Sequence, residues 1–349
     1  MANPVAIESS NFALWAGKQV GRGTPVATAD KFLRQVDGNV DIERTFGNEN
    51  YGDGQRYSNA QDFTNTVVGG GDVGFQGQPG PASWMLAQHL GTDSIGAPVS
   101  TVYPHTITPA NAGGRWLTVW KKVGSAVGPH RVKYNDTRIA QLQVSCSQGA
   151  KVLRMTPTLL SIDPGEVFTS DPVKADDDAS NVTDQPFLWT EATGLWNFDG
   201  GGAGAVGEVD EVNVTMNDNL DAWYGDDVKP ALVVPGRGVV TVSFAYALTD
   251  LTLPVYNKVH YGSASPAGGA KPVKTIFSGS LDVTMTRGAT TTLRSLRLEV
   301  PKINYAASLA IAGNADGGVV KLPMAGEARI LTGSPIIRWT GNTLDSVAY

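Results

Sequence analysis

The sequence has few charged residues and a single cysteine. Only 17% of its 349 residues are Asp, Glu, Lys or Arg, compared with about 25% in an average soluble protein. The chain also has 41 glycines and 20 prolines, which argues against a helical bundle because both residues are poor helix formers. With Cys146 alone, the chain forms no internal disulfide and no metal site built on several cysteines. These shortages favour a β-rich chain with many turns.

Long apolar runs are missing as well. No stretch approaches the roughly 20 apolar residues of a membrane-spanning helix, and the first residues, Met-Ala-Asn-Pro-Val-Ala-Ile-Glu, have neither the basic nor the apolar region of a signal peptide. Hydrophobic residues nevertheless make up 41% of the chain, enough to fill a core. We therefore expect a folded protein that has no membrane partner. It stays in a reducing cytoplasm or leaves it only inside a larger particle.

Acidic residues are concentrated in one region. Between Asp163 and Asp227 the sequence has 16 acidic residues and one basic residue, Lys174, although the net charge of the whole chain is only −6. Such a stretch is either a set of solvated loops or an exposed acidic surface that repels other polyanions.

Hydrophobic and polar residues alternate in several segments, a pattern typical of antiparallel strands with one buried face and one wet face. The segments are residues 141–147, 211–217, 240–246, 277–286 and 296–300. Their wet faces carry Gln, Ser, Thr and Asn in place of the Lys and Glu that commonly protect an exposed sheet. The sequence predicts a mainly β protein, an antiparallel β-sandwich or barrel.

One or two short helices are expected. Residues 83–90 follow the turn Pro79-Gly80-Pro81 and stop at Gly91, which gives a helix a start and a glycine end. Residues 251–261 are the second candidate.

An order of elements occurs twice. Residues 40–91 and residues 212–262 both read as strand, loop, strand, short helix and glycine, with few identical residues. Chance similarity between two β segments is one explanation. Internal duplication is the other, and it would give two β units: residues 1–165, and residues 166–349, which open with the acidic region.

Motifs for catalysis and cofactor binding are lacking. Residues 69–74 and 202–207 match Gly-x-Gly-x-x-Gly, but neither is followed by the helix on which a pyrophosphate would sit. The four histidines are scattered without metal-ligand spacing, and basic residues form no nucleic-acid footprint. We expect no catalytic residue, no metal and no cofactor, although a carboxylate pair within the acidic region is not excluded.

Four segments together carry a family resemblance. They are residues 21–27 (GRGTPVA) with residues 31–33 (KFL), residues 81–91, residues 212–225 (VNVTMNDNLDAWYG) and residues 235–242 (PGRGVVTV). In this order, over nearly the whole chain, they resemble the tail tube (major tail) proteins of long-tailed bacteriophages, the siphophages. The acidic residues 171–184 and the glycine-rich residues 200–207 depart from the family pattern.

The resemblance implies a virion structural protein, synthesised in the host cytoplasm. Such proteins are β-sandwich subunits that join into rings, and the rings stack into a hollow tube through which genome DNA is ejected. A tape measure protein and a tail terminator are the implied partners, DNA passes transiently and non-specifically, and there is no enzyme activity. A duplicated chain would form a trimer ring with pseudo-sixfold symmetry, and otherwise a hexamer ring is expected.

A conduit for DNA needs a wall that does not bind phosphates, and neutral amides and hydroxyls suit it better than lysine or arginine. The candidate lumen-facing residues are Gln141, Gln143, Ser145, Ser147, Asn213, Thr215 and Asn217. Plain exposure to solvent, or a polar interface, is the alternative for each strand.

Four other features are candidates for contacts between subunits. Arg237, in a Pro-Gly-Arg-Gly turn, is expected to pair with carboxylates of a neighbour, or else to lie in water. Three segments are candidates for ordering on assembly: the arm up to Asn11, the loop of residues 47–62, and the tail of residues 340–349.

Two rival functions remain open. The first is a carbohydrate- or receptor-binding β-sandwich adhesin of a phage particle, with Trp189, Trp196 and Trp223 as groove aromatics unless they fill the core. The second is a β-rich hydrolase that uses carboxylates of the acidic region.

Overall fold

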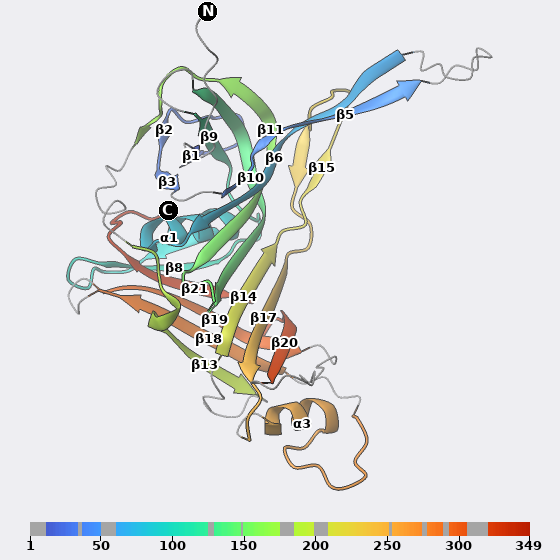
Figure 1. The fold of residues 1–349 in the computed structure, drawn as a ribbon. Helices are drawn as coiled ribbons and strands as arrows, with labels where there is room; N and C mark the ends of the chain where they lie inside the picture. Colours follow the sequence, from blue (N-terminus) through green and yellow to red (C-terminus); the bar gives the residue numbers. More distant parts are fainter. Residues whose placement is uncertain are drawn as a thin grey trace, which may run out of the picture.

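The computed structural model describes residues 12–33, 37–49, 61–124, 129–147, 149–174, 185–198, 209–250, 253–273, 278–288, 293–305 and 320–349. These residues form a mainly β protein with a large antiparallel sheet and two short helices (Figure 1). The five alternating segments lie in strands wherever they are described. The predicted mainly β class is therefore confirmed.

The first part of the chain contains one helix and eleven strands among its described residues. They are β1 (Phe12–Lys18), β2 (Thr28–Ala29), β3 (Lys31–Leu33), β4 (Asp37–Gly38), β5 (Asp41–Glu49), β6 (Gln61–Gln76), α1 (Pro79–Leu90), β7 (Gly91–Ile95), β8 (Tyr103–Pro109), β9 (Leu117–Val123), β10 (His130–Ser147) and β11 (Arg154–Val167).

The second part contains a further helix, a 3-10 turn and the remaining described strands. They are β12 (Val173–Lys174), η2 (Trp189–Glu191), β13 (Ala192–Phe198), β14 (Val209–Asn217), β15 (Asp221–Trp223), β16 (Leu232–Val234), β17 (Val239–Ala247), α3 (Leu253–Tyr261), β18 (Ser278–Arg287), β19 (Arg294–Tyr305), β20 (Lys321–Ala328) and β21 (Arg338–Thr343).

Two long hairpins, β10–β11 and β18–β19, organise the sheet. One strand of each hairpin is shared between two further partners. β10 pairs with β9 along its first part and with β14 along its second part, and β19 pairs with β21 and then with β20. β17 joins β14 to β20, so strands from distant parts of the chain form one hydrogen-bonded system.

The two predicted units share this sheet. Their boundary, between residues 165 and 166, falls inside β11. β10 pairs with β14 across that boundary, and β8 pairs with β21. A single hydrophobic cluster contains residues of both units, including Phe75, Leu142, Leu298 and Trp339. Both units thus contribute to one sheet and one core.

Helix α1 lies inside the molecule, and all twelve of its residues are buried. It begins at Pro79, four residues before the predicted start, because proline in the first turn has no N–H that needs an intrahelical partner. It ends at Gly91, which has the left-handed backbone conformation (φ 90°). Its neighbours are β3, β7, β8, β10, β19 and β21, so it joins the two parts of the core.

Helix α3 occupies the place predicted for the second helix, beginning at Leu253, and Gly262 follows it with φ 72°. A strand pair followed by a helix and a glycine therefore occurs twice: β5, β6, α1 and Gly91, and then β14, β17, α3 and Gly262, although in the second case the short strands β15 and β16 lie between the two long strands. The surroundings differ, because the residues of α3 range from exposed to buried while α1 is wholly buried.

The two ends of the predicted loop of residues 47–62 are strands of one long hairpin. β5 continues to Glu49 and β6 starts at Gln61, with Gly47 paired to Phe63. Residues 50–60 lie outside the described part of the chain. The described ends of β5 and β6 project from the body in Figure 1.

Candidate functional site

The candidate lumen-facing residues of β10 and β14 lie side by side. In the antiparallel register the pairs are Gln141 with Asn217, Gln143 with Thr215, Ser145 with Asn213, and Ser147 with Glu211. Residues directly opposite each other project from the same face of a sheet, so all seven candidates share one face. They are partly exposed, and the Asn217 amide donates a 3.5 Å hydrogen bond to Gln141 Oε1.

This face extends onto both neighbouring strands. On β11, Thr156 and Thr158 lie opposite Gln143 and Gln141. On β17, the residues opposite Thr215 and Asn213 are Thr241 and Ser243. We call these side chains the polar face: Gln141, Gln143, Ser145, Ser147, Thr156, Thr158, Asn213, Thr215, Asn217, Thr241 and Ser243. It spans four adjacent strands, and the charged residue on this face of β14 is Glu211, which is exposed at the end of the strand opposite Ser147.

Charged side chains border the polar face and are largely paired with each other. Arg154, opposite Ser145, forms an ion pair with Asp37. Thr158 Oγ1 donates a 2.5 Å hydrogen bond to Asp72. On the far side, Glu327 lies opposite Thr241 and pairs with Arg329.

The opposite face of the same strands is apolar. Leu142, Val144 and Cys146 of β10 are buried, and they pack in the large core cluster with Leu298 and Trp339. Burial raises the pKa of the Cys146 thiol to about 11, so this cysteine stays protonated and unreactive. The alternation along β10 thus separates a dry face from the polar face.

Arg237 is exposed in the turn between β16 and β17. Its carbonyl accepts a 2.6 Å hydrogen bond from the Asn219 amide, which fixes the turn. Among the described residues its guanidinium has no ion-pair partner, so the charge is available to a carboxylate from outside.

The tryptophans considered for glycan binding differ in their surroundings. Trp223 is 60% exposed. Trp189 is partly buried against the large core cluster. Trp196 is in β13, and its side chain lies outside what the structure describes. These three positions therefore form no described aromatic groove.

The described residues hold no group of three or more His, Cys, Asp or Glu side chains that could bind a metal ion. No helix in the described part of the chain is long and apolar enough to cross a membrane. Two parts of the acidic region, residues 175–184 and 199–208, lie outside the described ranges.

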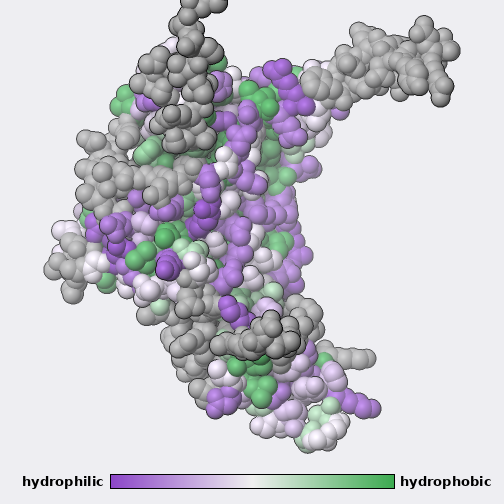
Figure 2. Space-filling model, in the orientation of Figure 1, coloured by the Kyte–Doolittle hydropathy of each residue, from purple (hydrophilic) through white to green (hydrophobic). Residues whose placement is uncertain are grey.

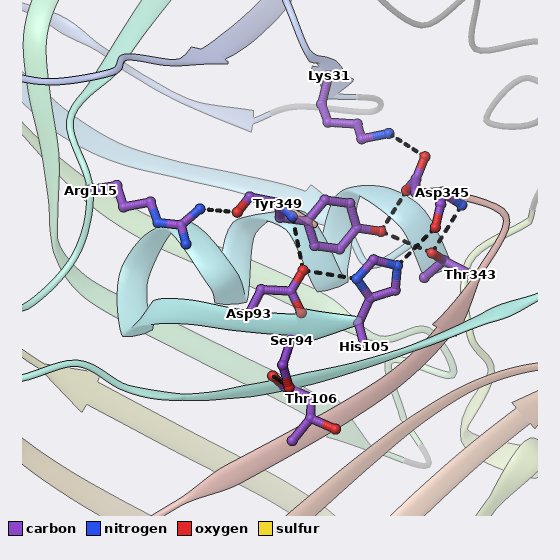
Figure 3. Close-up of polar contacts among 9 residues, drawn as sticks. All are labelled: Lys31, Asp93, Ser94, His105, Thr106, Arg115, Thr343, Asp345 and Tyr349. Carbon is purple, nitrogen blue, oxygen red and sulfur yellow. Dashed lines mark hydrogen bonds and ion pairs between the residues drawn. The ribbon is translucent and has the colours of Figure 1, made fainter. Parts of the chain in front are cut away.

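A buried polar network near α1 was not predicted from the sequence (Figure 3). His105 Nδ1 in β8 lies 2.9 Å from Asp93 Oδ2 in β7, and neither side chain is exposed. His105 Nε2 lies 3.0 Å from the Asp345 carbonyl oxygen. Both ring nitrogens are therefore engaged, which leaves this His–Asp pair without a free nitrogen for acid–base chemistry.

The network holds residues 344–349 against the body. The Tyr349 ring stacks on His105 with centroids 4.3 Å apart, and its main-chain N–H donates to Asp93 at 2.8 Å. Lys31 Nζ lies 3.0 Å from Asp345 Oδ1, and Arg115 donates to the main-chain oxygen of Tyr349. The predicted assembly tail is thus the end of β21 followed by a segment that contacts the body through Asp345 and Tyr349, while residues 346–348 are exposed.

The network shifts the pKa of the His105 imidazole. Burial lowers this pKa, but the hydrogen bonds to Asp93 and to the Asp345 carbonyl outweigh burial, and the net shift is upward. Beside the network is an open pocket of about 520 Å³, whose lining includes Lys18, Asp30, Lys31 and Trp84 together with residues 344–349.

In comparisons with known proteins, no family model matches this chain and no curated protein is detectably similar to it.

Proposed function

We propose that this chain is the repeating subunit of a siphophage tail tube, a structural protein of the virion tail, which forms rings that stack into a conduit for genome DNA. The observation that carries the proposal is the polar face, a surface of amides and hydroxyls across four strands, β11, β10, β14 and β17, with charged residues only at its edges. Four segments, spread in order over nearly the whole chain, also resemble this family.

The composition of the polar face fits the task of letting DNA slide. Lysine and arginine on a conduit wall would neutralise phosphates and release counterions, which makes DNA bind. Amides and hydroxyls hydrate the wall without that gain. Two arginines at the borders of the polar face, Arg154 and Arg329, form ion pairs with Asp37 and Glu327.

We further infer a sandwich-type subunit with an internal duplication, supported by the twofold occurrence of strand, strand, helix and positive-φ glycine. Such a duplication makes a trimer ring with pseudo-sixfold symmetry the sharper hypothesis and a hexamer ring the simpler one. A tape measure protein and a tail terminator would be the partners at assembly.

Electron microscopy of the purified chain tests this function. Negative staining is expected to show rings or tubes, and cryo-EM of a tube then counts the subunits in each ring. Six identical subunits per ring would exclude the trimer. Isolated particles at every concentration and ionic strength would overturn the tube.

An adhesin is the second candidate, favoured by the 60% exposure of Trp223, since exposed aromatics stack on sugar rings. Binding of a glycan by the soluble protein, lost in Trp223→Ala, would support it. Polymerisation into tubes would contradict it.

A further inference from the structure

The small sheet β15–β16 has an apolar outer face. Trp223, Leu232 and Val234 are 60%, 43% and 45% exposed. Trp223 lies opposite Leu232, and Asp221 lies opposite Val234, so these four side chains share one face. We call it the hairpin face. Val233 points the other way and is 3% exposed, which shows that the opposite side of the hairpin is packed on the body.

The hairpin is fixed to the rest of the molecule. The Val228 carbonyl accepts a 2.8 Å hydrogen bond from the Val67 N–H of β6, and Lys229 Nζ lies 3.1 Å from Asp163 Oδ1 in β11. In Figure 1, β15 lies beside the β5–β6 ladder. A two-stranded sheet by itself is marginally stable, so these anchors hold the hairpin face in one orientation and reduce the entropy lost on docking.

Opposite charges stand at the two ends of the hairpin face. Asp226 and Asp227 are exposed at the tip of the hairpin, and Arg237 is exposed three residues beyond Val234, at its base. Among the described residues none of the three has an ion-pair partner. Asp221, on the hairpin face, is also exposed at the base, so the tip carries two carboxylates and the base carries Arg237 beside Asp221.

We propose that the hairpin face docks on the same face of a second copy of this chain, related by a two-fold axis. In an antiparallel pair, the Asp226 and Asp227 carboxylates of one copy meet the Arg237 guanidinium of the other at both ends. Trp223 then packs over Val234 of the second copy, where Asp221 can accept a hydrogen bond from the indole N–H. The acidic tip of each copy then meets the arginine at the base of the other, and two-fold pairing is the commonest arrangement among homo-oligomers.

This inference goes beyond the proposed tube. A two-fold pair closes on itself and does not propagate, so it describes the chain before it is built into a tube. Only three large apolar side chains lie on the hairpin face, and a stable interface buries about 1,200 Å² or more in total. We therefore expect a weak dimer, with a Kd on the order of 10 μM.

Complementary charge variants test the pairing by sedimentation velocity. Arg237→Glu makes both ends acidic, and the double change Asp226→Lys with Asp227→Lys gives the tip the same charge sign as Arg237. We expect each variant alone to be monomeric at concentrations where the wild type dimerises, and an equimolar mixture to dimerise again. Trp223→Ser is expected to weaken the wild-type dimer at least tenfold. Lys271→Glu, the same charge change at an exposed remote position, should dimerise like the wild type.

The outcomes separate this inference from the tube. A wild-type chain that is monomeric up to about 200 μM, well above that expected Kd, overturns the hairpin contact. So does a dimer that survives Arg237→Glu, or a mixture that stays monomeric. Glycan binding through Trp223 by a monomer would assign the hairpin face to another ligand. None of these results alters the electron microscopy test, which decides the tube independently.

Discussion

His89 and His105 are both buried, and their surroundings shift the pKa of the two imidazoles in opposite directions. His89 is in α1; burial lowers its pKa, and the nearby Asp218 carboxylate, 3.9 Å away, compensates only in part. His105 is hydrogen-bonded to Asp93, and its pKa is raised. The fold therefore favours a neutral His89 and a protonated His105.

This difference predicts opposite pH dependences for two variants. His105 stabilises the fold fully below its unfolded pKa of about 6.5, and that contribution is lost as the pH rises through its folded pKa. His105→Gln should therefore lower the free energy of unfolding by about 3 kcal/mol at pH 6 and by less at pH 9. His89→Gln should cost most above pH 6.5 and progressively less as the pH falls toward 5.

Urea denaturation of both variants and the wild type at pH 5, 6, 7 and 9 measures these differences. If each variant's free energy of unfolding differed from that of the wild type by the same amount at every pH, the assigned protonation states would be contradicted.

At the scale of elements, α1 depends on the glycine that ends it. Gly91 has φ 90°, and its N–H donates to the Ala87 carbonyl. A Cβ at this position would lie 2.4 Å from the Gly113 carbonyl oxygen. The chain must turn sharply here because β7 begins at the same residue and carries Asp93 to His105.

Gly91→Ala is expected to lower the free energy of unfolding by about 2 kcal/mol or more, since a left-handed conformation is costly for a side chain and the Gly113 main chain must also shift. Thermal unfolding monitored by circular dichroism measures the loss. Gly21→Ala is the matched control, because a Cβ there meets nothing within 4 Å. Equal melting temperatures for the two variants would show that the glycine at position 91 is dispensable.

At the scale of the whole molecule, charge is distributed unevenly over the surface. Figure 2 shows hydrophilic residues spread over much of one side of the body. On the polar face the middle of each central strand carries amides and hydroxyls, and the charged residues, among them Glu211 at one end of β14, lie at its borders. If this face lines a conduit, adding one positive charge per subunit places a ring of positive charges along the wall, and the assembled tube then binds DNA.

Gln143→Lys tests this consequence. The side chain is partly exposed on a sheet face, so the free energy of unfolding should change by no more than about 0.5 kcal/mol. Tubes assembled from the variant should retain short duplex DNA at low salt and release it as salt rises, whereas wild-type tubes should not retain it. Thr332→Lys, in an exposed turn, is the control. Equal retention by the two variant tubes would place the polar face away from the DNA path.

The sequence by itself determined the local features of this protein. Alternation along residues 141–147 and 211–217 predicted two strands and the wet face of each, because a strand's period of two assigns every side chain to a face. The proline-rich start and Gly91 predicted α1 to within four residues. These features depend on neighbours in the chain, which the sequence displays directly.

Only the tertiary structure decided which elements meet. That Gln141 lies beside Asn217 follows from the pairing of β10 with β14, and neither strand carries a signal for the other. In the tail of residues 340–349, Asp345 contacts His105 across 240 positions of sequence. His105 and Asp93 carry no spacing that marks them as partners; the β7–β8 register and the returning tail bring them together. Such contacts are settled by the packing of the whole core around α1, because a buried imidazole and carboxylate need hydrogen-bond partners that other elements bring to them.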